Sequence, residues 1–414
     1  MSLIKPFRGL RPLAGRADDV AAPPYDVVDR AEAKSLAEGR PCSFLHVSRP
    51  EIDLPADSDP YAAEVYAKGR ENLDRMAAEG VLVRDPVPCY YAYRLTMGTH
   101  VQTGLVATAS VADYDRGRIK KHEFTRPVKE DDRVRQIDAL NAQTGPVFLV
   151  YRADPVVDGI LREVTGAPAD VDVTVERDGV RHEVWKIDRG ETLDALTRRF
   201  EAMPAIYVAD GHHRSAAASR VGHARRTANP AHTGEEGYNH FLSVIFPHDQ
   251  MQILDYNRVV RDLHGQSRDQ FLTAIGESFA IERSDQPVRP AETGEFGMYL
   301  DGQWYRLRIH PEAIPVDDPV GRLDVSLLQK GLIEPLLGIT DPRRDDRIDF
   351  VGGIRGLEGL EKRVDSGGWA VAFSLYPTTM QALMDVADAG EVMPPKSTWF
   401  EPKLADGLVS HVLD

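Results

Sequence analysis

The sequence predicts an α/β (α+β) fold in which mixed sheets with β-hairpins surround a strand–turn–helix unit. Two hairpin signals indicate the sheets: Asp178-Gly179 and Asp301-Gly302 each stand between two strand-like runs, and Asp-Gly is a favoured two-residue hairpin turn. The strand–turn–helix unit is indicated at 206–219, where an apolar run leads directly into helix-forming residues. Hydrophobic residues make up 42% of the chain and charged residues 28%, as in an ordinary globular protein.

Capping residues and apolar patterns define the elements of the first half of the chain. Asp59-Pro60 supplies a capping aspartate and an N1 proline, and Gly80 follows the end of the same helix. Val147–Tyr151 reads VFLVY, an apolar run that indicates a fully buried strand. The elements predicted up to residue 203 are a helix over 29–38, a strand over 43–47, a helix over 59–78, strands over 89–97 and 101–109, a buried strand over 147–151, a hairpin over 171–187 and a helix over 191–203.

Capping residues and apolar patterns also define the elements of the second half of the chain. Ser267 is a helix cap, and Pro335 is expected to interrupt a helical stretch because proline lacks the backbone N–H. The polar segment 225–237 is expected to be a mobile surface loop or lid. The remaining predicted elements are strands over 206–208, 241–246 and 251–254, helices over 257–262 and 267–279, a hairpin over 296–309, a helix over 325–337, a strand over 347–351, a helix from 357, a strand over 369–375 and a helix over 378–389.

The turn Asp210-Gly211-His212-His213-Arg214 is the most informative stretch, because it lies between the predicted strand and the predicted helix. The first turn of a helix carries unpaired N–H groups and the positive end of the helix dipole, so it attracts anions. Gly211 allows a phosphate to approach the backbone, Arg214 offers a fork of donors, and Asp210 is a base or a metal ligand. In the alternative interpretation Asp210 caps the helix and the other polar residues are solvated.

A second charged stretch, Arg116–Arg135, is basic within an otherwise acidic chain. It is either an anion site or partner patch, or a solvated helix face. Within it, Glu123 is a candidate general base, and Lys121 and Arg126 are candidate phosphate ligands. Near the N-terminus, Tyr25, Asp26 and His46 are either pocket-lining residues or groups at a turn and a core edge.

Two stretches near the C-terminus are weaker candidates for phosphate binding. Gly352 and Gly353 follow a strand and precede a helix, a geometry that suits a phosphate but fits neither the Walker pattern nor GxGxxG. A plain tight turn explains them equally well. Lys396 lies in PPKSTWF, which is either a rigid loop that presents phosphate-binding donors or a tail that packs Trp399 and Phe400 into the body.

The turn ADGHHR resembles the DGxHR turn of ParB/sulfiredoxin-like folds, which include nucleotide-using enzymes and free-serine kinases. Over nearly its full length the chain resembles the family called domain of unknown function 1015. The stretches that carry this resemblance are AAPPYDVV at 21–28, HEFTRPVKEDDR at 122–133, NAQTGPVFLVY at 141–151, ADGHHR at 209–214 and PPKSTWF at 394–400.

A nucleotide-dependent small-molecule kinase is the leading functional hypothesis. The resemblance implies ATP or ADP with Mg²⁺ as cofactors, His212, His213 and Arg214 as ligands of the nucleotide phosphates, and free serine or a related hydroxyl compound as acceptor, with Asp210 helping to take its proton. One alternative is a ParB-like regulator that binds nucleotide or DNA. Another is a metal-dependent hydrolase or phosphatase using Asp210, His212, His213 and His122, although HExxH spacing is absent.

Composition limits the partners and the compartment. A net charge of −15 opposes binding to nucleic acid or to an anionic membrane, and no apolar run approaches the length of a membrane span. Two cysteines, Cys42 and Cys89, form no disulfide framework, so we expect a reduced cytoplasm. The expected partners are a small-molecule substrate and a nucleotide, and the oligomeric state is left open between monomer and homodimer. We expect an N-terminal α/β subdomain over 1–150, a core with the ADGHHR turn over 151–290 and a C-terminal α/β subdomain over 291–414.

Overall fold

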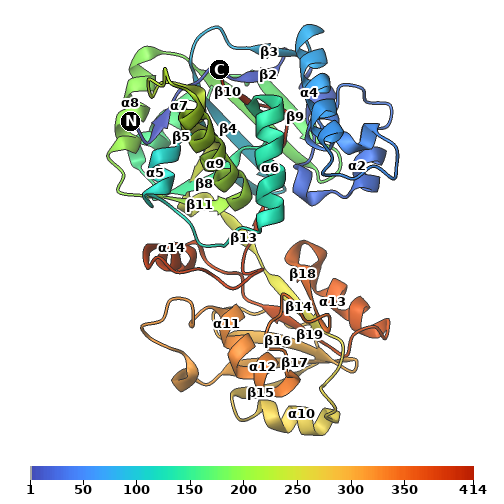
Figure 1. Cartoon of the computed structure of the whole chain (residues 1–414). Coiled ribbons are helices and arrows are strands. Elements are labelled where there is room, and N and C mark those ends of the chain that lie inside the picture. Colours follow the sequence, from blue (N-terminus) through green and yellow to red (C-terminus); the bar gives the residue numbers. More distant parts are fainter. Residues whose placement is uncertain (1) are drawn as a thin grey trace. The chain divides into compact units, whose positions relative to one another are not determined.

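The computed structural model of the protein describes residues 2–414, which divide into two compact units. Unit 1 comprises the described residues up to 251 together with 402–414, and unit 2 comprises residues 252–401. The boundary expected at 150 falls within a strand of unit 1, β8 (Val147–Tyr151). The boundary expected at 290 falls between two strands of one sheet in unit 2, β15 (Phe279–Ser284) and β16 (Glu295–Leu300). The α+β class with mixed sheets and hairpins is confirmed in both units (Figure 1).

Unit 1 is built on a nine-stranded mixed sheet. The hairpin predicted around Asp178-Gly179 is present, with Val175 paired to Val180. One short strand, β1 (Ile4–Lys5), pairs with β5 off the main path. The other strands follow the spatial order β6 (Ile119–Lys120), β11 (Ile206–Asp210), β8, β12 (His240–Pro247), β5 (His100–Ser110), β4 (Tyr90–Met97), β10 (Val180–Ile187) and β9 (Val171–Val175).

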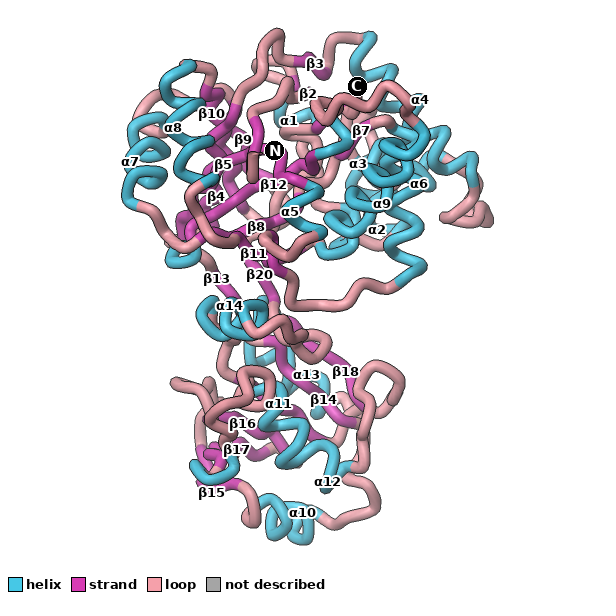
Figure 2. The backbone as a smooth tube through the Cα atoms, turned by 60° about the vertical axis from the view of Figure 1, so that its left-hand side comes forward, coloured by secondary structure: helices cyan, strands magenta, loops and turns pink. Residues whose placement is uncertain are grey.

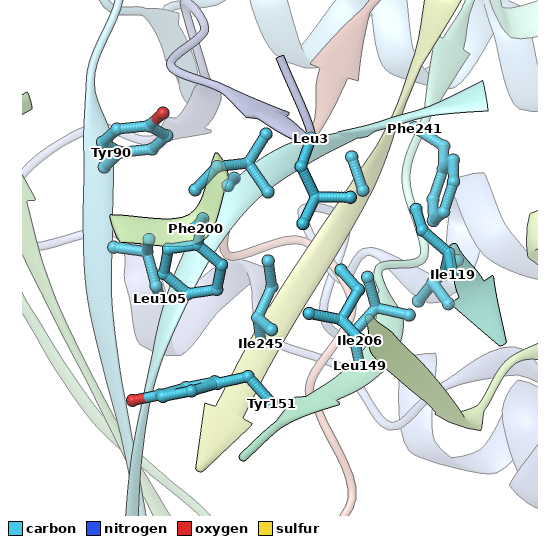
Figure 3. Packing of buried hydrophobic residues seen from close by; sticks show 14 of the residues in the cluster. Leu3, Tyr90, Leu105, Ile119, Leu149, Tyr151, Phe200, Ile206, Phe241 and Ile245 are labelled. Atoms are coloured by element: carbon cyan, nitrogen blue, oxygen red, sulfur yellow. The ribbon is translucent and has the colours of Figure 1, made fainter. Parts of the chain in front are cut away.

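The core of unit 1 forms where the middle strands of this sheet meet their covering helices. All five residues of β8 are buried, as the VFLVY run predicts, because a strand covered on both faces has no polar side. Figure 3 shows how side chains from distant parts of the chain interdigitate there. They include Leu3, Tyr90, Leu105, Ile119, Leu149, Tyr151, Phe200, Ile206, Phe241 and Ile245.

Two long helices lie side by side in unit 1, α6 (Pro127–Leu140) and α9 (His212–Ala228) (Figures 1 and 2). Helix α6 occupies the second half of the charged stretch, where exposed charges such as Lys129 stand beside largely buried ones, Asp132 at 7% and Arg133 at 12% exposure. Its N1 proline fixes the helix start, and Asn141 ends it in the left-handed conformation, with φ 49°. The other helices of unit 1 include α2 (Arg30–Ala37), α4 (Ala63–Ala78), α7 (Pro155–Val164) and α8 (Gly190–Glu201).

Residues 402–414 return to unit 1 and are held there by backbone pairing. Ala22 and Asp406 form an antiparallel bridge, as do Leu10 and Ser410. The short strand β21 (His411–Val412) pairs with β7 (Ala142–Gln143). This C-terminal segment therefore brings residues from the end of the chain next to residues near its beginning.

Unit 2 has a six-stranded sheet and a separate two-stranded pair. The hairpin predicted at Asp301-Gly302 is confirmed, since Leu300 pairs with Gln303. The sheet follows the order β15, β17 (Gln303–Ile309), β16, β19 (Val371–Leu375), β14 (Tyr256–Val260) and β18 (Ile348–Gly352), and the pair joins β13 (Gln252–Leu254) to β20 (Trp399–Glu401). The helices of unit 2 include α10 (Arg268–Ile275), α11 (Asp324–Leu328), α12 (Glu334–Leu337), α13 (Gly356–Asp365) and α14 (Met380–Asp388).

Several predicted elements are wrong. The strand expected at 43–47 is instead helix α3 (Leu45–Ser48). The helix expected at 257–262 is largely strand β14, whose polar residues are nevertheless buried. Helix α9 extends to Ala228 into the loop expected at 225–237. The helical stretch predicted over 325–337 is present, and its α-helical pattern is interrupted before Pro335: a π-helical turn over Gln329–Ile333 follows α11, and Pro335 stands at the start of α12, where a proline needs no N–H partner.

Gly104 in β5 offers a test of the sheet packing. A Cβ at this position would lie 2.8 Å from the carbonyl oxygen of Ile245 and 2.8 Å from the ring of Phe246. We therefore expect Gly104→Ala to destabilise unit 1 by about 1–3 kcal/mol through overpacking, measured by calorimetric thermal unfolding. Gly159→Ala is the matched control, because no atom lies within 4 Å of its Cβ in helix α7 and alanine favours helix by about 0.5–1 kcal/mol. Equal effects of the two substitutions would contradict the packing described.

Candidate functional site

The turn between β11 and α9, which we call the corner (residues 210–214), has the predicted strand–turn–helix geometry. Gly211 adopts φ 94°, a left-handed conformation that residues with side chains rarely take. A Cβ at Gly211 would also lie 3.0 Å from Nε of Arg214. Helix α9 begins at His212, so the backbone N–H groups of its first turn have no partner within the helix. The sequence thus places a helix N-terminus directly after a tightly turned glycine.

Asp210 anchors the corner through contacts on both of its carboxylate oxygens. Oδ1 accepts a hydrogen bond from the Gly211 N–H at 2.7 Å, and Oδ2 accepts one from Nζ of Lys403 at 2.9 Å. Nη2 of Arg214 lies 3.9 Å from Oδ1. Burial opposes ionisation of this carboxyl, but the charges of Lys403 and Arg214 outweigh it and hold the pKa of Asp210 well below its usual range. Asp210 is therefore a permanently charged anchor and a weak base.

Arg214 points into a group of acids rather than toward solvent. Its side chain is 11% exposed, and Nη2 lies 3.6 Å from Oδ2 of Asp26. Nη1 donates a hydrogen bond to the carbonyl oxygen of Pro146. In the described residues Nε of Arg214 is buried without an acceptor. One strong donor at the start of α9 is consequently unused by the protein.

The two histidines of the corner have different surroundings. His212 is 4% exposed, and its ring stands perpendicular to that of His122 with 4.5 Å between centroids. Burial lowers the pKa of His122 to about 4 and that of His212 well below its ordinary value, so both rings are neutral at pH 7. Nε2 of His212 has no hydrogen-bond partner among the described residues, while Nδ1 lies 3.8 Å from Oε2 of Glu123.

His213 connects the corner to the charged stretch. Its Nε2 accepts a hydrogen bond from the backbone N–H of Arg126 at 2.9 Å, and burial together with the charge of Arg126 lowers the pKa of His213. The Arg126 side chain is exposed and makes no hydrogen bond or ion pair within the described residues. Lys121, in the same stretch, holds its Nζ 4.4 Å above the centre of the Tyr114 ring. The structure therefore brings Glu123 and Arg126 to the corner, as predicted from separate stretches.

Three residues of the site lie outside the corner and outside the charged stretch 116–135. Lys403 and Asp406 are supplied by the C-terminal segment, and no local pattern identifies them because Lys403 meets a residue 193 positions earlier. Asp26 was a candidate pocket residue and does face Arg214. His46, considered with it, instead pairs with Asp53 at 2.8 Å and belongs to a different part of unit 1.

A small cavity of about 30 Å³ lies behind Arg214, with room for about one water molecule. Oδ1 of Asp406 is buried there without a hydrogen-bond partner among the described residues. On the same cavity, the guanidinium carbon of Arg133 lies 3.8 Å from the centre of the Tyr25 ring. The cavity is far too small for a nucleotide, so any ligand of that size must approach the corner from its exposed side.

The remaining sequence candidates lie in unit 2, where packing explains the glycines. A Cβ at Gly352 would lie 2.9 Å from the ring of Trp399, and one at Gly353 would lie 2.3 Å from Oδ1 of Asp255. The N–H of Gly353 donates to the Asp255 carbonyl at 2.7 Å. Lys396 is exposed, has φ 60°, and holds Nζ 5.4 Å above the centre of the Tyr256 ring.

Within residues 2–414, no three side chains of His, Cys, Asp or Glu are grouped so that they could hold a metal ion. None of the helices in the described chain combines the length and the apolar character that a membrane crossing requires.

Asp406 gives the site a testable pH dependence. Burial raises its pKa to about 7 from an ordinary 3.8, with Arg214 acting in the opposite direction. Because the folded-state pKa lies above the unfolded-state value, the stability that the protonated form provides is lost as the pH rises toward and through 7. We expect the Tm of Asp406→Asn, which stays neutral, to rise relative to the wild-type Tm between about pH 5 and about pH 8. Thermal unfolding across this range would show parallel curves if Asp406 did not titrate there.

Comparisons with solved structures give distant resemblances. A free serine kinase in complex with AMP is 13% identical with a TM-score of 0.35, over 73% of this chain and 92% of that chain. A conserved hypothetical protein from Pyrococcus furiosus is 13% identical with a TM-score of 0.34, over 76% and 98% of the two chains. SbnI with a C-terminal truncation, from Staphylococcus aureus, is 10% identical with a TM-score of 0.37, over 73% and 85%. Resemblance at this level carries no argument about activity.

A comparison with curated proteins finds no match. A family model described as "Protein of unknown function (DUF1015)" matches residues 4–326. Since this match covers most of the chain, the protein belongs to the DUF1015 family.

Proposed function

We propose that the protein is a nucleotide-dependent phosphotransferase that acts on a small hydroxyl compound at the corner. The observation that carries the proposal is that Nε of Arg214 and Nε2 of His212 are both buried and have no hydrogen-bond partner among the described residues. A buried donor without an acceptor costs about 1–3 kcal/mol. The Arg214 Nε, a donor beside the N-terminus of α9, is explained most simply by an anionic ligand that accepts from it.

The exposed side of the corner supplies the surface on which phosphates would bind. The N–H groups of the first turn of α9 point out of the helix start, and the backbone of Arg126, whose side chain is exposed, is held to this turn through His213. Lys121 lies on the same stretch as Arg126 and adds a second exposed cation. Phosphoryl transfer requires such positive groups around the migrating phosphate. ATP or ADP provides the required polyphosphate.

Mg²⁺ commonly accompanies nucleotide phosphates and neutralises their charge. The side chain of Asp26 is 38% exposed, so its carboxylate can act as a ligand of such an ion that keeps several water ligands. Asp26 also lies opposite Arg214, which makes it the acidic group best placed to face a phosphate bound there.

Glu123 is the residue that we assign as general base. Its side chain is 48% exposed and lies 3.8 Å from the His212 ring, so it can reach a hydroxyl group bound at the outer side of the corner. Asp210, the other candidate, is held by Lys403 with a depressed pKa and instead orients the turn. The resemblance of the turn to that of free-serine kinases makes free serine the first acceptor to test. No observation favours the DNA-binding or metal-hydrolase alternatives over this one.

Arg126→Ala tests phosphate binding without disturbing the fold. Because this side chain makes no hydrogen bond or ion pair with the protein, we expect an unchanged Tm and an affinity for ATP or ADP lowered about tenfold or more, through loss of one charge-assisted contact. Isothermal titration with each nucleotide, with and without Mg²⁺, measures this. Arg226→Ala is the matched control, since Arg226 is an exposed arginine in the last turn of α9, at the opposite end of that helix from the corner. An equal loss of nucleotide affinity in both variants would mean that the nucleotide responds only to the overall charge of the protein, and would contradict a specific contact with Arg126.

Glu123→Gln tests the chemistry separately from binding. We expect nucleotide affinity to change little and the rate of phosphate transfer to fall about 100-fold or more, as when a general base is removed. Transfer from ATP or ADP to serine and to other small hydroxyl compounds can be followed by mass spectrometry of the product. A variant that retains the wild-type rate would exclude Glu123 as the base.

A further inference from the structure

Arg258 in strand β14 of unit 2 is a buried cation at a position that the proposed function does not use. It is 4% exposed and lies within the sheet, where Phe350 of β18 pairs with it on one side and Phe373 of β19 on the other. Lysine and arginine are almost never buried to this extent unless they are paired with an acid. The surroundings of Arg258 therefore need an explanation.

In the described part of the chain, no carboxylate pairs with Arg258. Nη1 donates to the carbonyl of Tyr256 and Nη2 donates to the carbonyl of Lys396 at 3.0 Å. Arginine has five N–H donors, so three of them have no acceptor among residues 2–414. The adjacent acid, Asp255, accepts a hydrogen bond from Asn257 and lies 3.8 Å from Arg289.

Leaving this charge uncompensated costs free energy, because burial removes its hydration and carbonyl dipoles replace only part of it. Burial lowers the pKa of Arg258 to about 10, which is the effect of the same penalty. A neutral side chain of similar length could pack against the Phe350 ring, whose centre lies 5.0 Å from the guanidinium carbon. The sheet therefore contains a charge that its own stability does not require.

A second cation, Lys396, belongs to the loop that follows Pro395, and the backbone of this loop contacts Arg258. The carbonyl of Lys396 accepts from Arg258, while Nζ of Lys396 lies 5.4 Å above the centre of the Tyr256 ring. The loop is fixed by Ser397, whose Oγ donates to the Pro394 carbonyl at 2.6 Å and whose carbonyl accepts from Thr378 at 2.7 Å. The left-handed φ of 60° at Lys396 is consistent with a conformation imposed by these contacts.

We propose that Arg258 and Lys396 form a binding site for a phosphate group in unit 2, separate from the corner. The planar guanidinium of Arg258 offers directed donors to the oxyanion, and the Lys396 ammonium adds a mobile point charge. The proposal does not depend on the function proposed for unit 1. The phosphate is either free or carried by a small metabolite, and the experiment distinguishes these sources.

The opposing interpretation is that Arg258 only ties two carbonyls together. The two interpretations predict opposite signs for the stability of Arg258→Met. If the arginine is purely structural, its replacement removes two stabilising hydrogen bonds, and the variant has a lower Tm than the wild type. A charge kept for ligand binding is costly without its ligand, so we expect the Tm of Arg258→Met in phosphate-free buffer to equal or exceed that of the wild type.

The test is thermal unfolding of the full chain with increasing inorganic phosphate at constant ionic strength, repeated with phosphoserine as a metabolite-borne phosphate. We expect a rise in the wild-type Tm that is absent in Arg258→Met and reduced in Lys396→Met. Lys396 is exposed, so its variant should fold even if the other does not. A larger rise with phosphoserine than with phosphate identifies a metabolite as the source, and an equal or smaller rise identifies free phosphate.

Two control variants locate the effect. Arg261→Met removes an exposed arginine with similar contacts: its guanidinium carbon lies 4.8 Å from the centre of the Trp369 ring, and its Nε donates to the carbonyl of Asp346. The rise in Tm should persist in this variant. The rise should also persist in Arg126→Ala, which alters only the corner. A rise that is lost in Arg126→Ala but kept in Arg258→Met and Lys396→Met would overturn this proposal and support the corner. The absence of any rise in the wild type would also overturn it.

Discussion

The contact between Asp210 and Lys403 is the constraint on which the site depends. It joins the end of β11 to the C-terminal segment at 2.9 Å, and it lies beside Arg214, Asp26 and Asp406. An uncompensated buried charge costs free energy, so these residues stabilise one another by lying together. Removal of Arg214 would leave three acids without their common cation, and we expect such a variant to lose stability as well as any ligand.

This arrangement separates two tasks within the corner. Asp210 fixes the backbone turn and the direction of helix α9, while its depressed pKa removes it from proton transfer. The Arg214 Nε, a donor without an acceptor among the described residues, then remains fixed, which is the preorganised state that favours binding of an anion. Glu123 and Arg126, on the neighbouring stretch, are exposed side chains beside the corner, where they can contact a bound substrate.

Local signals predicted much of this fold. The two Asp-Gly pairs predicted both hairpins, and the run VFLVY predicted a fully buried strand. Gly211 before His212 predicted the strand–turn–helix corner. The failures were of two kinds. The helix predicted over 257–262 is wrong because Asn257 and Arg258, although polar, are buried in strand β14. Lys403 and Asp406 were missed because only the return of the C-terminal segment, through pairs such as Ala22 with Asp406, brings them to the corner.

The central claim is that the corner binds a phosphate group at the start of α9. Hydrogen–deuterium exchange of the full chain with and without ADP tests it most directly, because a bound phosphate accepts hydrogen bonds from the first-turn amides. The account predicts slower exchange in peptides that cover residues 209–215 and 121–127. Unchanged exchange in both segments at saturating ADP, with protection confined to other parts of the chain, would contradict it.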